Sequence, residues 1–266
     1  IFLKNVDPRL NSTYIFLTYD KEMNVRRNTK LRAVEGLPQP VDSLSDLAYK
    51  VPDPLPKKSF ALYVCGQPGS GKSNLWLQML LSRPTKRNPN QSKMYYKYFD
   101  RIYLISGSLA TLPMKRLGLD DAQIFSSYSD ESLDSIINLE KQAENHNTLL
   151  VLDDVIRDLT RSKELSKAIL NRRHITQNTE ESGQAGFSML ITSQVYNWLP
   201  LGLRKNMSHV ILFRTENVRE KNAIKSELMG DLDETTANMV MNTAWDGNHS
   251  FLLILCEKPT RERYYR

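Results

Sequence analysis

A glycine-rich turn near residue 70 constrains this chain more than any other feature of its sequence. Residues 66–73 read GQPGSGKS and fit the pattern G-x-x-x-x-G-K-[ST] at every specified position. An apolar run from Phe60 to Cys65 precedes the turn, and a helical pattern from Lys72 to Leu81 follows it. A strand, a glycine turn and a helix in this order predict a loop whose backbone N–H groups surround a phosphate group.

The residue types in this turn explain how it would hold a nucleotide. Glycines allow successive N–H groups to point inward, and the following helix turns its positive end toward the same anion. Lys72 is placed to reach the β- and γ-phosphates, and the Ser73 hydroxyl is placed to bind Mg²⁺. The predicted nucleotide contacts are Gly66, Gln67, Pro68, Gly69, Ser70, Gly71, Lys72, Ser73 and Asn74.

A second apolar run ends in two carboxylates. Residues 148–154 read TLLVLDD, the pattern of a strand that ends beside the phosphate loop. We expect Asp153 to hold Mg²⁺ through water and Asp154 to accept a proton from an attacking water. Many hydrolases of this kind have Glu at the second position, so the shorter Asp154 has to lie closer to the water. An ordinary solvated strand end is the alternative interpretation.

A third apolar run, from Leu190, ends in Thr-Ser-Gln. Gln194 is placed to sense the γ-phosphate or to orient the attacking water. Because a polar residue often ends a strand, a purely structural Gln194 is the alternative.

Hydrolysis develops negative charge on the transferring phosphoryl group, which an arginine from a neighbouring subunit can stabilise. Arg172 and Arg173, at the end of a predicted helix, are the first candidates for this role. Basic residues also stabilise helix C-termini for purely local reasons. The later candidates are Arg204, Arg214 and Arg219.

Apolar runs alternate with helical patterns from Ser59 onward. Near-continuous apolar runs are typical of strands buried on both faces, and their alternation with helices predicts an α/β core around a mostly parallel sheet. Ser129 is a candidate helix N-cap, with Leu133, Ile136, Ile137 and Leu139 on an apolar face. Strands are expected at 60–65, 101–105, 149–152, 187–192, 209–213 and 251–256, and helices at 72–81, 129–145 and 161–173.

Residues 1–58 differ from the rest of the chain. Five prolines lie between Leu37 and Pro56, and proline disfavours regular elements. We therefore expect an extended N-terminal arm and proline-rich linker over 1–58 and the ATPase core over 59–266.

Composition excludes several classes of protein. No apolar run reaches the roughly 18 residues of a membrane-spanning helix, so we expect no membrane span. No charged start with an apolar run and a cleavage site is visible, which argues against secretion. Cys65 and Cys256 lie in apolar runs and are expected to be buried thiols, not a disulfide or a metal site.

Positive charge is concentrated in one stretch. The chain has 36 Lys and Arg against 30 Asp and Glu, a net charge of +6. Residues 83–101 hold six basic residues and one acidic residue. Basic groups neutralise phosphates and aromatic rings stack on exposed bases, so this stretch is a candidate DNA contact through Lys86, Arg87, Lys93 and Lys97, with Tyr95, Tyr96, Tyr98 and Phe99 between them. A solvated loop whose aromatic rings pack on the core is the alternative.

Together these motifs resemble the FtsK/HerA superfamily of P-loop motor ATPases. The segments GQPGSGKSN, LLVLDD, NRRH and ITSQVYNWLPLGLRKNMSHVILFR are most similar to those of the genome-packaging ATPases of large double-stranded DNA viruses, virophages and polinton-like elements. The resemblance covers about 59–256 and leaves out the N-terminal arm. Asp154 departs from the pattern, because cellular members usually have Glu there.

The resemblance implies a RecA-like core that hydrolyses ATP with Mg²⁺. It places Lys72 and Ser73 on ATP and Mg²⁺, Asp153 on the metal, Asp154 as base and Gln194 as sensor. It also implies a homo-oligomeric ring, a pentamer or hexamer, that threads double-stranded DNA through its pore. Viral capsid proteins would be partners, in the host cytoplasm, a viral factory or the virion. The resemblance does not identify which arginine reaches a neighbouring subunit's nucleotide, because Arg172 and Arg173 are adjacent and both match the position.

The sequence therefore favours an ATP-driven DNA translocase that packages a viral genome. Two alternatives remain. One is a nucleotide-dependent assembly or DNA-binding scaffold in which turnover is incidental. The other is a P-loop kinase, against which the Ser-Gln strand and the residues after it argue.

Overall fold

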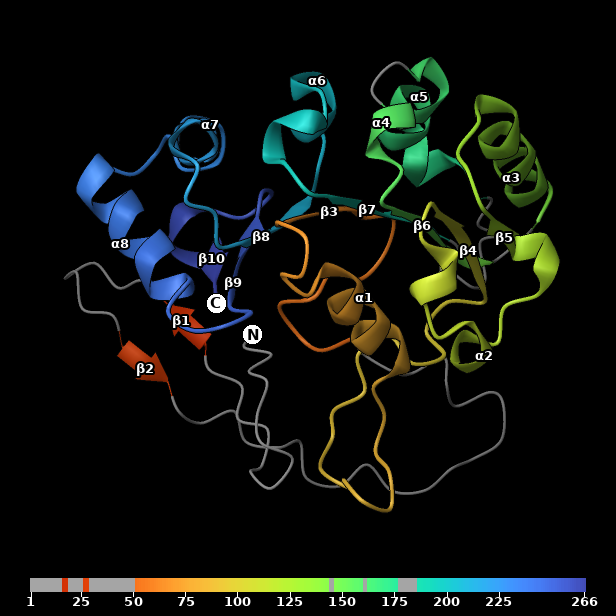
Figure 1. Cartoon of the computed structure of the whole chain (residues 1–266), viewed down its shortest axis with the longest axis horizontal. Coiled ribbons are helices and arrows are strands. Elements are labelled where there is room, and N and C mark those ends of the chain that lie inside the picture. The colour runs from red at the N-terminus through yellow and green to blue at the C-terminus, as the bar shows by residue number, and fades with distance from the viewer. Residues whose placement is uncertain (1–15, 19–25, 29–50, 144–145, 160–161, 177–185) are drawn as a thin grey trace.

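An eight-stranded sheet runs through the middle of the described chain, with helices on both sides (Figure 1). The structure is a computed structural model that describes residues 16–18, 26–28, 51–143, 146–159, 162–176 and 186–266. Apart from two short strands, β1 (Phe16–Thr18) and β2 (Arg26–Asn28), which pair antiparallel, the expected arm before residue 51 lies outside the described residues.

The strands of this sheet are arranged in the order β10-β9-β8-β3-β7-β6-β4-β5. All pairs from β8 to β5 are parallel, whereas β9 and β10 are antiparallel to their neighbours. The predicted, mostly parallel α/β sheet is thus confirmed. The bounds are β3 Ala61–Cys65, β4 Arg101–Ser106, β5 Ile124–Phe125, β6 Asn147–Asp153, β7 Gly186–Ser193, β8 His209–Phe213, β9 Phe251–Leu255 and β10 Tyr264–Tyr265.

Every residue of β3 is buried, which explains why its sequence is apolar without alternation. Successive side chains leave a strand on opposite faces, so Ala61 and Tyr63 join one core while Leu62 and Val64 join the other. Burying an aliphatic side chain stabilises the fold by about 1.5–3 kcal/mol. Two apolar cores, one on each face, therefore hold the sheet between its helices.

Helices cover both faces of the sheet. Figure 1 shows α1 (Lys72–Leu81) and α2 (Met114–Leu117) on one side, and α3, α4, α5, α6 and α7 on the other. The buried residues of α8 belong to the same core as those of α3, α5 and α7. The bounds are α3 Asp130–Gln142, α4 Ile156–Leu159, α5 Lys163–Asn171, α6 Leu201–Arg204, α7 Val218–Leu228 and α8 Glu234–Ala244, with 3₁₀ turns at Leu109–Thr111, Asp121–Gln123, Arg172–His174, Tyr196–Trp198 and Thr260–Glu262.

The structure corrects two details of the predicted helix at 129–145, the first of which is that the helix ends at Gln142. Ser129 caps α3 as expected, because its hydroxyl accepts the N–H of Ser132. Leu139, however, is 54% exposed and not on the apolar face. The helical period places Glu140 there instead, where it is fully buried. Its carboxylate accepts hydrogen bonds from Arg101, Tyr103 and Thr148, which tie α3 to β4 and β6.

Arg204 and Glu227 form a bidentate ion pair between α6 and α7. Arg204 Nε and NH2 lie 2.8 and 2.7 Å from the two carboxylate oxygens, and Tyr196 donates to Glu227 Oε2 over 3.0 Å. The Arg204 side chain is 9% exposed and that of Glu227 17%. Burial raises the pKa of Tyr196, so it remains a neutral donor. Tyr196 and Arg204, which belong to the YNWLP and LRKN parts of the family-like run, thus bind α7 and stabilise the fold.

Part of the predicted proline-rich linker, from residue 51 onward, packs in the core. Val51 and Leu55 are buried and pack with Phe60 in the core that contains α1. Cys65 is buried as expected, and burial raises the pKa of its thiol to about 12. Cys256 is only partly buried, because it lies just beyond the end of β9; both cysteines are free. Within the described ranges, no helix combines the length and apolar character that crossing a bilayer requires.

Replacing Glu227 with Ala should lower the free energy of unfolding by about 3–5 kcal/mol, because it leaves a buried guanidinium without its partner. Urea denaturation measures this loss. Glu216→Ala is the matched control, since both members of the Arg214–Glu216 pair are 64% exposed and such pairs contribute about 0–1 kcal/mol. Equal, small losses in both variants would contradict the buried-pair interpretation.

Candidate functional site

The strand order brings three chain segments to one edge of the sheet. This carboxyl edge is where the parallel strands β3, β7 and β6 end, at Cys65, Ser193 and Asp153. The strand β7 lies between the phosphate-loop strand β3 and the carboxylate strand β6. Gln194 is therefore placed between the loop and the carboxylates. The amide of Gly66 donates to the Ser193 carbonyl over 3.1 Å and ties the loop to β7.

Glycine is required in the loop for two separate reasons. A Cβ atom on Gly66 would lie 2.6 Å from Phe213 Cβ and 2.6 Å from Ser70 Oγ, so the backbone of the loop passes too close for a side chain. Gly71 has φ 105°, in the left-handed region that side chains disfavour. Gly71 also begins α1 without a side-chain cap. The first N–H groups of α1 are thus free of a local side-chain acceptor, as an anion site requires.

Ser70 supplies a further test of whether a phosphate fits. Its hydroxyl is buried and has no hydrogen-bond partner among the described residues. A buried polar atom without a partner is costly unless a bound group satisfies it. A phosphate group fits this site for three reasons: the tightly packed loop backbone, the start of α1 without a side-chain cap, and the unpartnered Ser70 hydroxyl.

Lys72 is half-buried at the start of α1. Its Nζ donates to the carbonyl oxygens of Gly66, at 2.6 Å, and Gln67, at 3.1 Å. Burial lowers the pKa of Lys72, whereas the charges of Asp153 and Asp154 act in the opposite direction. The ammonium group thus lies inside the loop, as the motif predicts.

Asp153 is 1% exposed and held by three donors. Thr192 Oγ1, Trp76 Nε1 and Ser73 Oγ lie 2.8, 3.2 and 3.4 Å from its carboxylate oxygens. Burial raises the pKa of Asp153, and the Thr192 and Trp76 hydrogen bonds oppose that effect. The predicted metal-binding residues Ser73 and Asp153 therefore face each other.

This donor set fits Mg²⁺. Magnesium binds oxygen ligands and takes only one or two from the protein, with phosphates and water supplying the rest. Ser73 and Asp153 provide a hydroxyl and a carboxylate. Within the described residues, no cluster of three His, Cys, Asp or Glu side chains offers a metal site of another kind.

Asp154 turns away from the core at the end of β6. Its φ is 58°, and its N–H donates to Thr192 Oγ1 over 3.0 Å. The side chain is exposed, and its Oδ1 accepts a hydrogen bond from Gln194 Nε2 over 3.0 Å. Asp and Asn tolerate positive φ better than Glu does. This backbone conformation gives a physical reason for the Asp at this position.

Two residues of the site were not predicted in their actual roles. Trp76 is buried in the core, and its indole N–H also holds Asp153. Thr192 was treated as part of an apolar strand, although it contacts both carboxylate residues. The sequence signal that could have identified Thr192 is its hydroxyl group, which follows the apolar residues Leu190 and Ile191. In the structure this residue is fully buried.

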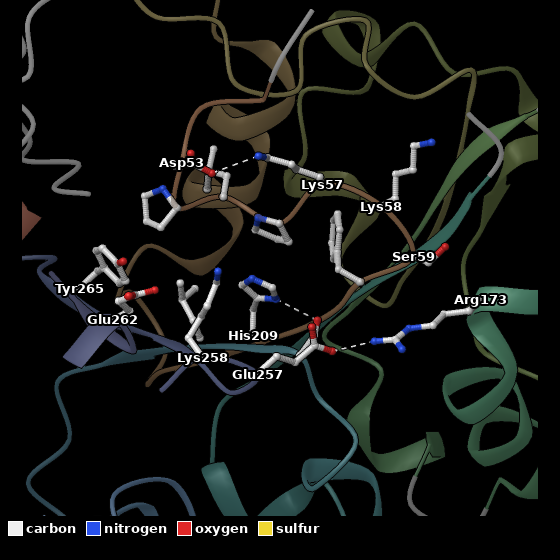
Figure 2. A pocket seen from close by; sticks show the side chains of 16 residues that line it. Asp53, Lys57, Lys58, Ser59, Arg173, His209, Glu257, Lys258, Glu262 and Tyr265 are labelled. Atoms are coloured by element: carbon white, nitrogen blue, oxygen red, sulfur yellow. Dashed lines mark hydrogen bonds and ion pairs between the residues drawn. The ribbon is translucent and has the colours of Figure 1, made fainter. Parts of the chain in front are cut away.

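Of the candidate trans arginines, Arg172 and Arg173 lie at the opposite, amino edge of the sheet. Arg204 is held by Glu227 in its own chain, and Arg214 follows β8 at the carboxyl edge. Arg172 is buried, and its guanidinium donates to the carbonyls of Ser59 and Ile169 at 2.7 and 2.8 Å. The Arg173 side chain is 61% exposed and forms an ion pair with Glu257 at 2.9 Å (Figure 2). Neither residue lies at the phosphate loop of its own chain. Their role toward a neighbour's nucleotide stays a prediction, for which Arg173 has the more accessible side chain.

A hollow of about 500 Å³ lies beside Arg173 at this amino edge (Figure 2). Its charged lining is mixed, and ion pairs join Arg173 to Glu257 and Lys57 to Asp53. Burial and the nearby Arg172 charge lower the pKa of His209 to about 4, so this histidine adds no positive charge. The hollow is thus separate from the phosphate loop and different in character.

The basic stretch at 83–101 forms the connection from α1 to β4. Lys86, Arg87 and Lys97 are exposed and Lys93 is partly exposed. Tyr95 and Phe99 are buried and pack against Phe60, while Arg83 donates to the Tyr96 hydroxyl. The buried rings favour the interpretation that these aromatics pack on the core. The four basic residues stay candidate DNA contacts.

Solved structures of viral packaging proteins have a similar fold. The genome-packaging NTPase B204 of Sulfolobus turreted icosahedral virus 2, bound to AMP, has a TM-score of 0.55 and 14% identity, over 79% of this chain and 96% of that chain. The DNA-packaging ATPase B204 of Sulfolobus turreted icosahedral virus has a TM-score of 0.54 and 14% identity, over 79% and 98%. No family model matches this sequence, and no curated protein does.

These likenesses confirm the predicted fold. At such low identity they show the fold alone: a RecA-like P-loop core whose sheet order places the phosphate loop, Gln194 and the two carboxylates at one edge.

Gly66→Ala should distort the phosphate loop, because the added methyl group meets Phe213 and Ser70. We expect a loss of about 1–3 kcal/mol in unfolding free energy and weaker binding of a fluorescent ATP analogue. Gly202→Ala is the control, since no atom lies within 4 Å of its added Cβ. Unchanged analogue binding by Gly66→Ala would contradict the close approach described here.

Proposed function

We propose that this chain is an ATPase of the FtsK/HerA type that moves double-stranded DNA, and that it packages a viral genome. The observation that carries the proposal is the arrangement at the carboxyl edge of the sheet. The phosphate loop lies there beside two carboxylates. The buried one, of Asp153, is hydrogen-bonded to Ser73, and the exposed one, of Asp154, is hydrogen-bonded to Gln194. The fold shared with the B204 packaging proteins supports the same function.

The residues divide the reaction between them. The loop N–H groups and Lys72 bind the phosphates. Ser73 and Asp153 would hold Mg²⁺, which would neutralise charge on the phosphate oxygens when bound. Asp154 accepts the proton of a water whose oxygen attacks the γ-phosphorus. The bond between the γ-phosphorus and the oxygen that bridges the β- and γ-phosphates breaks, and ADP and inorganic phosphate leave. Gln194 orients Asp154 and the water through its amide.

Coupling to DNA requires a ring in our proposal. In a closed ring, each interface joins two different faces of the chain. The phosphate loop and Arg173 lie at opposite edges of the sheet, so one chain's Arg173 can approach its neighbour's nucleotide only in such a head-to-tail arrangement. Lys86, Arg87, Lys93 and Lys97 would contact DNA phosphates, and capsid proteins would dock the ring on the virion.

Asp154→Asn should lower kcat for ATP hydrolysis by at least about 100-fold, the size of a general base's contribution. Affinity for an ATP analogue should stay within about twofold of wild type, because Asn tolerates the same positive φ. Lys72→Ala should lose both binding and hydrolysis. Phosphate release and analogue titration measure the two quantities. An Asp154→Asn enzyme with wild-type turnover would remove Asp154 as the base.

Charge reversal at Lys86 and Arg87 should weaken the stimulation of ATPase activity by long duplex DNA more than it weakens the basal activity. Loss of two phosphate contacts should also reduce the salt dependence of DNA binding by a log–log slope of about 2. Lys115→Glu combined with Arg116→Glu, on the exposed helix α2, is the matched control. Equal loss of basal and stimulated activity would exclude this stretch as the DNA contact.

The same measurements separate the alternatives. Nucleotide binding without turnover that responds to DNA would indicate a scaffold. Transfer of the γ-phosphate to an added nucleoside would indicate a kinase.

A further inference from the structure

His249 contacts the phosphate loop from the far end of the sequence. It lies in the turn between α8 and β9, and its Nδ1 is 2.9 Å from the carbonyl oxygen of Ser70. A carbonyl oxygen only accepts, so Nδ1 carries the hydrogen and donates it. The two residues are 179 positions apart, and no histidine motif in the sequence predicts this contact.

The turn that carries His249 is anchored on both sides. On one side, buried Trp245 donates its indole N–H to the Leu212 carbonyl of β8 over 2.9 Å. On the other side, Phe251 begins β9 and packs edge-on against Phe213, at 5.6 Å between ring centroids. Phe213 is the residue that closes in on Gly66. The turn is thus fixed to the same strands that support the phosphate loop.

His249 has a left-handed backbone conformation. Its φ is 58°, in a region where His, Asn and Asp occur more often than other residues with a side chain. The residue is on the exposed side of the turn, so apolar burial does not position its ring. The hydrogen bond to the Ser70 carbonyl directs the ring toward the loop.

The geometry of the peptide bond gives the contact a function. The C=O of Ser70 and the N–H of Gly71 belong to one planar, trans peptide unit and point in opposite directions. Holding the carbonyl toward His249 therefore directs the Gly71 N–H to the other side of the loop's backbone. That N–H is the last one before α1 begins at Lys72.

We propose that His249 is a positioning residue of the phosphate loop. By binding the Ser70 carbonyl, it fixes the Ser70–Gly71 peptide so that the Gly71 N–H is ready to bind a nucleotide phosphate. This inference rests on the proposed nucleotide site. It adds a contact, from the turn before β9, that the phosphate-loop motif does not contain.

Two substitutions separate the hydrogen bond from the backbone conformation. His249→Gly removes the donor and accepts positive φ without strain, so the turn keeps its path. His249→Asn keeps a donor and also tolerates positive φ. Its amide nitrogen is the same number of bonds from Cα as Nδ1 of histidine. Both variants should have the thermal stability of the wild-type protein within about 2 °C, since neither touches a core.

His249→Gly should raise the KM for ATP and weaken binding of an ATP analogue by about 5- to 10-fold, the effect of one hydrogen bond. His249→Asn should restore both values to within about twofold of wild type, while a role in packing alone would give no rescue. Equal affinities in the wild-type and Gly variants would overturn the inference. So would equal defects in both variants.

A second measurement does not depend on nucleotide. In protein labelled with ¹⁵N-glycine, the amide signal of Gly71 should shift or broaden in His249→Gly and return to the wild-type position in His249→Asn. If the wild-type protein bound no nucleotide, the proposed function would fail, and this signal would still decide the role of His249. An unchanged Gly71 signal in His249→Gly would overturn that role.

Discussion

One buried hydroxyl joins the two halves of the candidate catalytic site. Thr192 lies in β7, and its Oγ1 donates to Asp153 Oδ1 over 2.8 Å while accepting the N–H of Asp154 over 3.0 Å. A hydroxyl has one hydrogen and two lone pairs, so both bonds form at once. Thr192 therefore holds the carboxylate next to Ser73 and sets the backbone of the residue that we propose as the base.

The sheet order makes this connection possible. Because β7 lies between the phosphate-loop strand and the carboxylate strand, its end contacts both. Ser193 accepts the Gly66 amide on one side, and Thr192 and Gln194 hold Asp153 and Asp154 on the other. A shift of β7 along the sheet would thus disturb the nucleotide site and the water-activating site together.

Much of the fold was predictable because the signals are local. The strand bounds of β8 and the helix bounds of α1 match the expected ranges, since a run of buried apolar residues and a phosphate-loop pattern each mark their own ends. Helix α7 was not predicted, because it buries only Glu220 and Ile224 and has almost no apolar stripe. Leu139 was misplaced because a buried, hydrogen-bonded Glu140 takes the position where an apolar residue was expected.

The candidate site was predictable in its residue types but not in its connections. Lys72, Ser73 and Asp153 follow from motifs whose chemistry demands them. The positive φ of Asp154 and the bridging role of Thr192 depend on the pairing of β6 with β7, where the residues in contact are 38 and 39 positions apart. The contact of His249 with the loop joins residues 179 positions apart. No local pattern encodes which hydroxyl or imidazole will face a given backbone group after the sheet has formed.

Steady-state ATP hydrolysis by Thr192→Val tests the central claim most directly, because valine keeps the shape of threonine and loses only the hydroxyl. We predict that kcat falls by about 100-fold, the effect of misplacing a catalytic group. Thr192→Ser should keep most of the activity, and affinity for an ATP analogue should change little in either variant. A Thr192→Val protein that hydrolyses ATP at the wild-type rate would contradict the account.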